Sequence, residues 1–169
     1  MRIFLIGFMG SGKSSIGREL AHKLGLLFID LDSLIEEKTS SSISEIFSNQ
    51  GEEKFREIEQ QCLKETFKAD NVVIATGGGT PCFHNNMQLI NEHGISVYIK
   101  LNAGMLASRL ISDNGKRPLL KDHTTPEDFQ KHISQLLETR ELYYEKATFI
   151  VEGKNISAKK IIEKLSGSI

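Results

Sequence analysis

The segment Gly7–Ser14 has the residue types and the spacing of a site for phosphates. It reads Gly-Phe-Met-Gly-Ser-Gly-Lys-Ser, which fits the pattern G-x-x-x-x-G-K-[ST] of a phosphate-binding loop. Glycines let the backbone curl so that successive N–H groups face an anion. In such a loop Lys13 reaches the β- and γ-phosphates and the Ser14 hydroxyl binds Mg²⁺. The segment predicts a nucleoside triphosphate site, and the alternative is a glycine-rich turn without a ligand.

The residues on either side of this segment are those expected to hold it at the end of a strand. Ile3–Ile6 is an apolar run short enough for a buried strand, and Ile16, Leu20 and Leu24 then recur at helical spacing. A helix that begins at the loop adds unpaired N–H groups and the positive end of its dipole. The order of strand, glycine loop and helix is the context that makes the pattern specific.

Along the rest of the chain, apolar runs alternate with helical patterns. We expect further strands at 26–30, 72–75, 95–99 and 148–151, and helices at about 33–38, 52–68, 85–93, 102–110, 125–146 and 157–165, with a short amphipathic piece at 43–47 that stops near Gly51. Asn102, Thr125 and Ser157 are the expected helix caps. This alternation predicts an α/β fold, in which a mostly parallel sheet has helices on both faces and ligands beyond the carboxyl ends of its strands.

Two further groups of residues follow predicted strands and should lie at the same edge of the sheet as the phosphate loop. Asp30 and Asp32 close the second strand, and both carboxylates point to one side if the strand persists through Asp32. One then serves the metal and the other faces the phosphoryl acceptor; the alternatives are a structural role for Asp30 and a helix cap for Asp32. Gly77–Gly79 follows the third strand and either offers N–H groups to a substrate or forms a flexible turn.

The spacing of three arginines favours ordinary structural roles. Glu52 and Arg56 are one helical turn apart, as in a surface ion pair, which is a common and weak interaction. Arg109 and Arg140 lie on predicted helices without a motif around them, so the same interpretation applies to both.

Arg117 differs because it lies in the polar, glycine-containing segment 112–123, which has the composition of a mobile loop. In phosphotransferases, an arginine that closes over the triphosphate neutralises the charge that develops during transfer. Arg117 is therefore a candidate for that role, and the alternative is a solvated loop charge.

Composition restricts the class of protein further. The 169 residues fit one domain, and a net charge of −1 with a pI near 6.5 gives no electrostatic basis for binding nucleic acid or an anionic membrane. Cys62 and Cys82 are too few for a disulfide framework or a zinc site. No signal-peptide pattern opens the chain, and no apolar run approaches the ~20 residues that span a bilayer. We therefore expect a cytoplasmic monomer.

Taken together, these motifs resemble those of the shikimate kinases over nearly the whole chain. The shared motifs are Gly10–Ser14, Asp30-Leu31-Asp32, Gly51-Glu52 with Phe55-Arg56 and Glu59, Gly77–Gly79, Arg117–Leu120, and Arg140 with Tyr143. The resemblance implies a nucleoside-monophosphate-kinase-like P-loop fold, three-layered (α-β-α) with a five-stranded parallel sheet. It implies one domain over 1–169, with a core of 1–32, 61–111 and 124–169, a substrate-binding segment at 33–60 and a lid at 112–123.

The resemblance also implies an activity, which is ATP-dependent phosphorylation of the 3-hydroxyl of shikimate on the route to chorismate and aromatic amino acids, with Mg²⁺ as cofactor. The implied catalytic residues are Lys13, Asp32 and Arg117, and the implied metal-binding residues are Ser14 and Asp30, the latter through water. The implied contacts to shikimate are Asp32, Arg56, Gly77, Gly78, Gly79 and Arg140, whose two arginines hold the carboxylate. The implied contacts to ATP are Gly10, Ser11, Gly12, Lys13, Ser14, Ser15, Arg109, Arg117 and Asn155.

Three other interpretations stay open on the sequence. A sugar-acid kinase of the gluconate type shares the phosphate loop and an acceptor that is a polyol with a carboxylate. An adenylate-kinase-like enzyme would have proline where Met9 stands. A GTPase-like switch would need an Asn-Lys-x-Asp motif, which the sequence lacks, since Asn155 is followed by Ile156.

Overall fold

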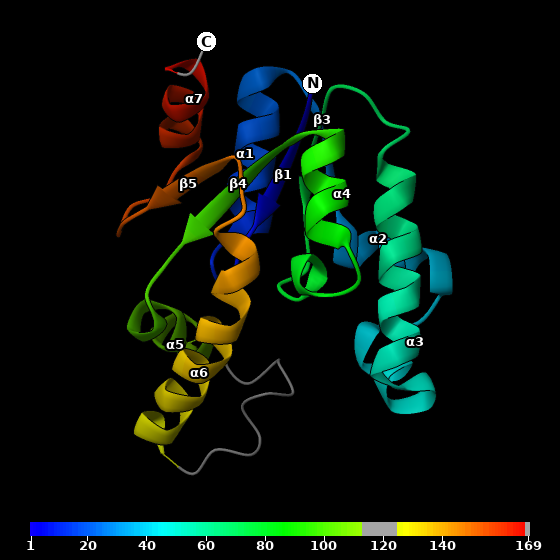
Figure 1. Cartoon of the computed structure of the whole chain (residues 1–169), viewed down its shortest axis with the longest axis vertical. Coiled ribbons are helices and arrows are strands. Elements are labelled where there is room, and N and C mark those ends of the chain that lie inside the picture. The colour runs from blue at the N-terminus through cyan, green and yellow to red at the C-terminus, as the bar shows by residue number, and fades with distance from the viewer. Residues whose placement is uncertain (113–124, 168–169) are drawn as a thin grey trace.

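A five-stranded parallel sheet forms the centre of the fold in the computed structural model, which describes residues 1–112 and 125–167 (Figure 1). Its strands are β1 (Arg2–Ile6), β2 (Leu27–Asp30), β3 (Val72–Ala75), β4 (Ile95–Lys100) and β5 (Phe149–Glu152). They lie in the order β2-β3-β1-β4-β5, and every neighbouring pair is parallel. The predicted α/β fold with a five-stranded parallel sheet is confirmed.

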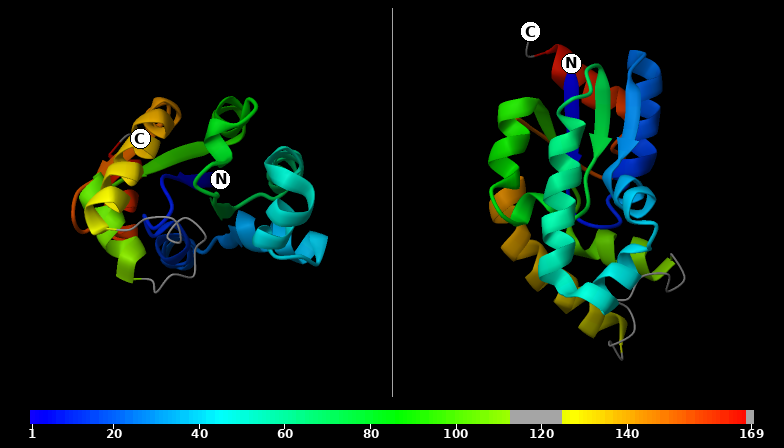
Figure 2. Two further views of the ribbon diagram at one scale, coloured as in Figure 1. Left: turned by 90° about the horizontal axis from the view of Figure 1, so that it is seen from below. Right: turned by 90° about the vertical axis from the view of Figure 1, so that its right-hand side faces the viewer.

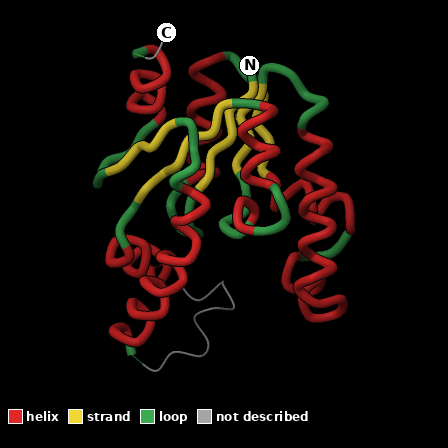
Figure 3. The backbone as a smooth tube through the Cα atoms, in the orientation of Figure 1, coloured by secondary structure: helices red, strands yellow, loops and turns green. Residues whose placement is uncertain are grey.

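Helices cover both faces of this sheet (Figure 3). Side chains alternate along β1, so that Ile3 and Leu5 face one layer and Phe4 and Ile6 face the other. The first layer contains α1 (Lys13–Leu24) and α7 (Ala158–Ser166). The second contains α3 (Ile43–Thr66), α4 (Asn86–His93) and α6 (Pro126–Tyr144). Strands buried on both faces explain why β1 and β3 are apolar throughout their central residues.

The predicted helix caps are confirmed. The Asn102 side chain accepts a hydrogen bond from the Met105 N–H at 2.9 Å, before α5 (Ala103–Ser112). Thr125 Oγ1 accepts from the Asp128 N–H at 3.1 Å, with proline in the first helical position of α6. Ser157 Oγ accepts from the Lys160 N–H at 3.4 Å. Each cap is set by residues a few positions apart, which is why the sequence alone predicts it.

The end of β2 differs from the prediction. The extended conformation does not persist through Asp32, because α2 (Leu31–Thr39) begins directly after Asp30. Asp30 is the residue that caps α2, and its carboxylate accepts a hydrogen bond from the Ser33 N–H at 3.3 Å. The alternative of an Asp32 cap is therefore wrong, and Asp32 lies in the first turn of the helix.

The predicted stop near Gly51 is confirmed as a break within α3. Gly51 has φ 82° and ψ 170°, a left-handed backbone conformation that glycine adopts without strain. A capping box between Ser42 and Glu45 starts the short piece before the break. The long piece after the break buries Phe55 and Cys62 against the core.

The carboxyl ends of the strands share one end of the molecule. In the view from that end, α2 and α3 lie on one side and α5 and α6 on the other (Figure 2, left). The 3₁₀ turn η1 (Thr80–Cys82) follows Gly77–Gly79 at the same end. Among the described residues, no helix is long and apolar enough to cross a membrane.

Candidate active site

The phosphate loop lies between β1 and α1, as predicted. Gly7, Gly10 and Gly12 have φ of 144°, 78° and 93°, conformations that strain any residue with a side chain. A Cβ at Gly7 would also lie 2.8 Å from the carbonyl oxygen of Ile99. Because α1 begins at Lys13, its unpaired N–H groups lie next to the loop. The buried Ser11 and the exposed Ser15 lie in the loop and in the first helical turn.

Lys13 lies inside the curl of this loop and is only 8% exposed. Its ammonium donates to the carbonyl oxygens of Gly7 at 2.8 Å and Phe8 at 2.9 Å. The backbone thus holds a positive charge at the centre of the loop, where phosphates would bind.

A pair of oxygen ligands lies beside the loop. The Ser14 hydroxyl donates to Asp30 Oδ2 at 2.5 Å, while the other carboxylate oxygen of Asp30 caps α2. Mg²⁺ is usually bound in such sites by one or two protein oxygens together with phosphates and water. Among the described residues, no cluster of three or more histidines, cysteines or carboxylates could hold a metal ion. The pair therefore fits a magnesium ion that arrives with a nucleotide better than a metal site made of protein alone.

The Asp32 carboxylate reaches the glycine segment after β3. A Cβ at Gly77 would lie 2.8 Å from Asp32 Oδ1 and 3.0 Å from Thr80 Oγ1. A Cβ at this position would require the Asp32 or Thr80 side chain to shift. Asp32 thus lies at the expected edge of the sheet, although a helical turn places it there instead of the predicted strand.

Arg56 makes the predicted ion pair with Glu52, at 3.2 Å; the Glu52 side chain is exposed, whereas that of Arg56 is buried. Its guanidinium carbon lies 3.9 Å from the centre of the Phe83 ring, and the residue is only 8% exposed. Its Nη1 also donates to the buried Glu59 at 2.8 Å. A Cβ at Gly79 would lie 2.6 Å from Arg56 Nη2. The predicted ion pair is thus present, but Arg56 itself is buried instead of lying on the surface.

Arg140 approaches the same glycines from α6. A Cβ at Gly78 would lie 3.5 Å from Arg140 Nη1, and the guanidinium lies 5.3 Å from the centre of the Phe8 ring. Arg140 Nη1 is buried and has no hydrogen-bond partner among the described residues. A buried guanidinium nitrogen without an acceptor is rare, and an anionic ligand would satisfy it.

Cys82 lies close to both arginines but is not activated by them. Burial raises the pKa of the Cys82 thiol to about 11, although the charges of Arg140 and Arg56 act in the opposite direction. The thiol is therefore protonated at neutral pH, and a thiolate is the form that reacts as a nucleophile.

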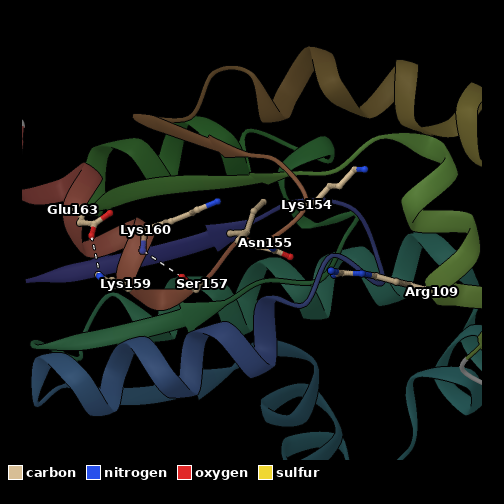
Figure 4. A pocket seen from close by; sticks show the side chains of 8 residues that line it. Arg109, Lys154, Asn155, Ser157, Lys159, Lys160 and Glu163 are labelled. Atoms are coloured by element: carbon tan, nitrogen blue, oxygen red, sulfur yellow. Dashed lines mark hydrogen bonds and ion pairs between the residues drawn. The ribbon is translucent and has the colours of Figure 1, made fainter.

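A cavity of about 550 Å³ lies beside the phosphate loop (Figure 4). Arg109 lines it and also donates to the carbonyl oxygen of Ser11, at 3.3 Å, which connects the cavity to the loop. Asn155 lines the cavity from the segment between β5 and α7. The structure thus brings both residues together at a site where a nucleotide base could bind. The candidate Arg117 lies outside the described residues, as does the predicted lid after Ser112.

A sequence model of the family described as shikimate kinase matches residues 9–169. The shikimate kinase of Azobacteroides pseudotrichonymphae is 47% identical, over 99% of each chain. The crystal structure of shikimate kinase from Bacteroides thetaiotaomicron has a TM-score of 0.90 at 36% identity, over 99% of this chain and 97% of that one. Shikimate kinase from Acinetobacter baumannii, in complex with shikimate, has a TM-score of 0.83 at 34% identity, over 99% of this chain and 91% of that one.

The chain belongs to the shikimate kinase family. The predicted enzyme class, a kinase that uses ATP to phosphorylate shikimate, is confirmed. The interpretations as a gluconate-type kinase, an adenylate-kinase-like enzyme and a GTPase-like switch are thereby excluded.

Two buried residues of this shikimate kinase site received no role from the sequence. Glu59 is 1% exposed and accepts hydrogen bonds from both Arg56 and Thr80 Oγ1, the latter at 2.7 Å. Its position three residues after Arg56 was a signal that could have identified it. Tyr144 is fully buried, and its hydroxyl donates to the carbonyl oxygen of Gly78. No local pattern connects residues that are 66 positions apart.

Proposed function

We propose that this chain transfers the γ-phosphoryl group of ATP to the 3-hydroxyl of shikimate at the carboxyl edge of its sheet. The observation that carries this proposal is the buried Nη1 of Arg140, which has no acceptor among the described residues. It lies beside Gly78, which in turn contacts the phosphate loop at Met9. A carboxylate bound at Arg140 would therefore place the rest of a small acceptor next to the phosphates.

For the nucleotide, we propose that Gly10–Ser15 surround the phosphates and that Lys13 contacts the transferred group. Ser14, and Asp30 through water, would hold Mg²⁺, which supplies charge neutralisation on the phosphate oxygens. Arg109 and Asn155 would contact the base in the adjoining cavity. Support comes from the hydrogen bond between Arg109 and the loop backbone, which holds cavity and loop together.

For the acceptor, we propose that Arg56 and Arg140 hold the shikimate carboxylate through charge-assisted hydrogen bonds. Asp32 would accept a hydrogen bond from the attacking hydroxyl and orient it toward the phosphorus. Gly77–Gly79 would let the groups that bind the acceptor lie close to the backbone, because a Cβ at Gly77 or Gly79 would lie within 3 Å of Asp32 or Arg56. Phosphoryl transfer has a loose transition state, so alignment and charge stabilisation are the main tasks of these residues.

The finer expectations remain part of the proposal. Arg117 would neutralise charge on the transferred group, from the lid at 112–123. The substrate-binding segment at 33–60, a monomeric state and a cytoplasmic location are likewise predictions.

The acceptor is tested by measuring ADP release from ATP with shikimate, gluconate or AMP offered separately. We expect shikimate alone to raise ADP release above the level with ATP only. Mass spectrometry and ³¹P NMR of the product would then locate the phosphate on the 3-hydroxyl. Phosphorylation of gluconate or AMP at a comparable rate, or of another hydroxyl of shikimate, would contradict the proposal.

A further inference from the structure

The Tyr144 hydroxyl makes a hydrogen bond that ties α6 to the glycine segment. The side chain is fully buried, and its hydroxyl donates to the carbonyl oxygen of Gly78 at 2.5 Å. Tyr144 follows Arg140 by one helical turn, so that both side chains leave the same face of α6. One helix face thus supplies the Arg140 guanidinium, whose Nη1 has no hydrogen-bond partner among the described residues, and also holds the loop that the guanidinium approaches.

This hydrogen bond fixes the orientation of one peptide group. The described chain has no cis peptide bonds, so the Gly79 N–H points opposite to the Gly78 carbonyl and away from the Tyr144 hydroxyl. None of the described residues accepts a hydrogen bond from this N–H. On one side of the peptide, a Cβ at Gly78 would lie 3.0 Å from the Met9 nitrogen; on the other, a Cβ at Gly79 would meet the Arg56 guanidinium.

We propose that Tyr144 is a positioning residue for the phosphoryl acceptor: by holding the Gly78 carbonyl it directs the Gly79 N–H toward the acceptor and sets its distance from Arg140. This inference rests on the proposed role of Arg140 and of the glycine segment. Without the hydroxyl, the Gly78–Gly79 peptide loses the contact that orients it, and glycine has little intrinsic preference for one conformation. The acceptor would then bind to a less ordered site.

Burial keeps the hydroxyl in the form that this role requires. It raises the pKa of Tyr144 above its usual range, although the charge of Arg140 acts in the opposite direction. The phenol therefore stays protonated, and remains a donor, at neutral pH.

The test is steady-state kinetics of Tyr144→Phe, with Tyr98→Phe as the matched control. Tyr98 is equally buried, and its ring centre lies 5.1 Å from that of Tyr144, but its hydroxyl donates to Glu141 instead of the glycine segment. In Tyr144→Phe we expect the KM for shikimate to rise about five- to tenfold, while kcat and the KM for ATP change less than about twofold. In Tyr98→Phe we expect all three to stay within about twofold of the original enzyme.

Two results would overturn the inference. One is a shikimate KM in Tyr144→Phe equal to that of Tyr98→Phe; the other is an equal rise in the KM for both substrates, which a general loss of structure would give. Should Tyr144→Phe not fold, Tyr144→Met removes the same hydroxyl with a side chain that adapts to irregular space. A parallel Arg140→Ala variant separates the two levels of the argument: unchanged shikimate affinity there would contradict the proposed site itself, whereas its loss there, with no effect in Tyr144→Phe, would contradict only the role of Tyr144.

Discussion

An arginine lies at each end of the parallel strands, Arg2 at their amino ends (the amino edge) and Arg140 at their carboxyl ends (the carboxyl edge). The two differ in whether their nitrogens have hydrogen-bond acceptors. At the amino edge, Arg2 donates to the carbonyl oxygens of Phe67 at 2.5 Å, Ala69 at 3.0 Å and His93 at 2.6 Å. These carbonyls lie at the ends of α3 and α4, where backbone acceptors lack helical partners. At the carboxyl edge, Arg140 Nη1 has no acceptor among the described residues.

This difference separates stability from function. A guanidinium in which each nitrogen donates within the chain, as in Arg2, stabilises the fold. A guanidinium nitrogen that is buried without an acceptor, as Nη1 of Arg140 is among the described residues, carries a desolvation cost, which a bound anion would remove. The glycines at the carboxyl edge also belong to the candidate site, since they keep side chains out of a space that Asp32, Arg56 and Arg140 surround.

Lys13→Ala should give the largest effect at the carboxyl edge. Because Lys13 puts a fixed charge where the phosphates would bind, we expect kcat to fall about 10²–10³-fold. Two loop carbonyls also lose a charged donor, so the melting temperature should fall, and kcat is measured at a temperature where the variant is folded. Lys23→Ala, on the exposed side of the same helix, is the control and should keep kcat. A Lys13→Ala enzyme with kcat near that of the original would remove Lys13 from the catalytic machinery.

Arg140→Ala tests the other side of the site. Loss of a charge-assisted hydrogen bond predicts that the KM for shikimate rises about 10–100-fold, while the KM for ATP stays the same. Because the variant also removes a buried guanidinium nitrogen that has no acceptor among the described residues, its melting temperature should not fall. A parallel loss of affinity for both substrates, with a lower melting temperature, would mean that Arg140 is structural and that the contrast with Arg2 is false.

Arg2→Ala should show the reverse pattern. Three backbone acceptors lose a charged donor, so we expect the free energy of unfolding to fall by about 2–3 kcal/mol. Urea denaturation measures this, and kcat/KM for shikimate should be unchanged at a temperature where the variant is folded. Lys68→Ala is the matched control, since it is an exposed cation near the same turn. A stable Arg2→Ala variant with reduced kcat/KM would contradict the division between the two edges.

The sequence was sufficient wherever a feature is decided by neighbouring residues. The phosphate loop, the caps at Asn102, Thr125 and Ser157, and the break at Gly51 each depend on a few consecutive side chains. They were predicted, and they are present. The alternation of apolar runs was likewise enough to predict the parallel sheet.

Features decided by distant contacts were not accessible in this way. Spacing predicted the Arg56–Glu52 ion pair correctly. The burial of Arg56, however, depends on Phe83 and Gly79, which belong to another segment. The residue that caps α2 depends on where β2 ends. The strand ends at Asp30, directly before Leu31, and Asp30 is therefore the cap. The Tyr144–Gly78 hydrogen bond joins two segments that only the fold brings together.

The smallest expected effect concerns Cys82, where burial and the two arginines of the carboxyl edge act against each other. Because burial raises the pKa of Cys82 to about 11, roughly one thiol in a thousand is ionised at pH 8. We expect iodoacetamide to modify it about a hundredfold more slowly than a free cysteine peptide, as measured by mass spectrometry of the peptide that contains Cys82. The rate should rise about tenfold per pH unit up to pH 10, and in Arg140→Ala it should be lower still, since a charge that favours the thiolate is lost. Modification at the rate of the free peptide would mean that the arginines outweigh burial, and that the site is better solvated than the unpartnered Arg140 nitrogen indicates.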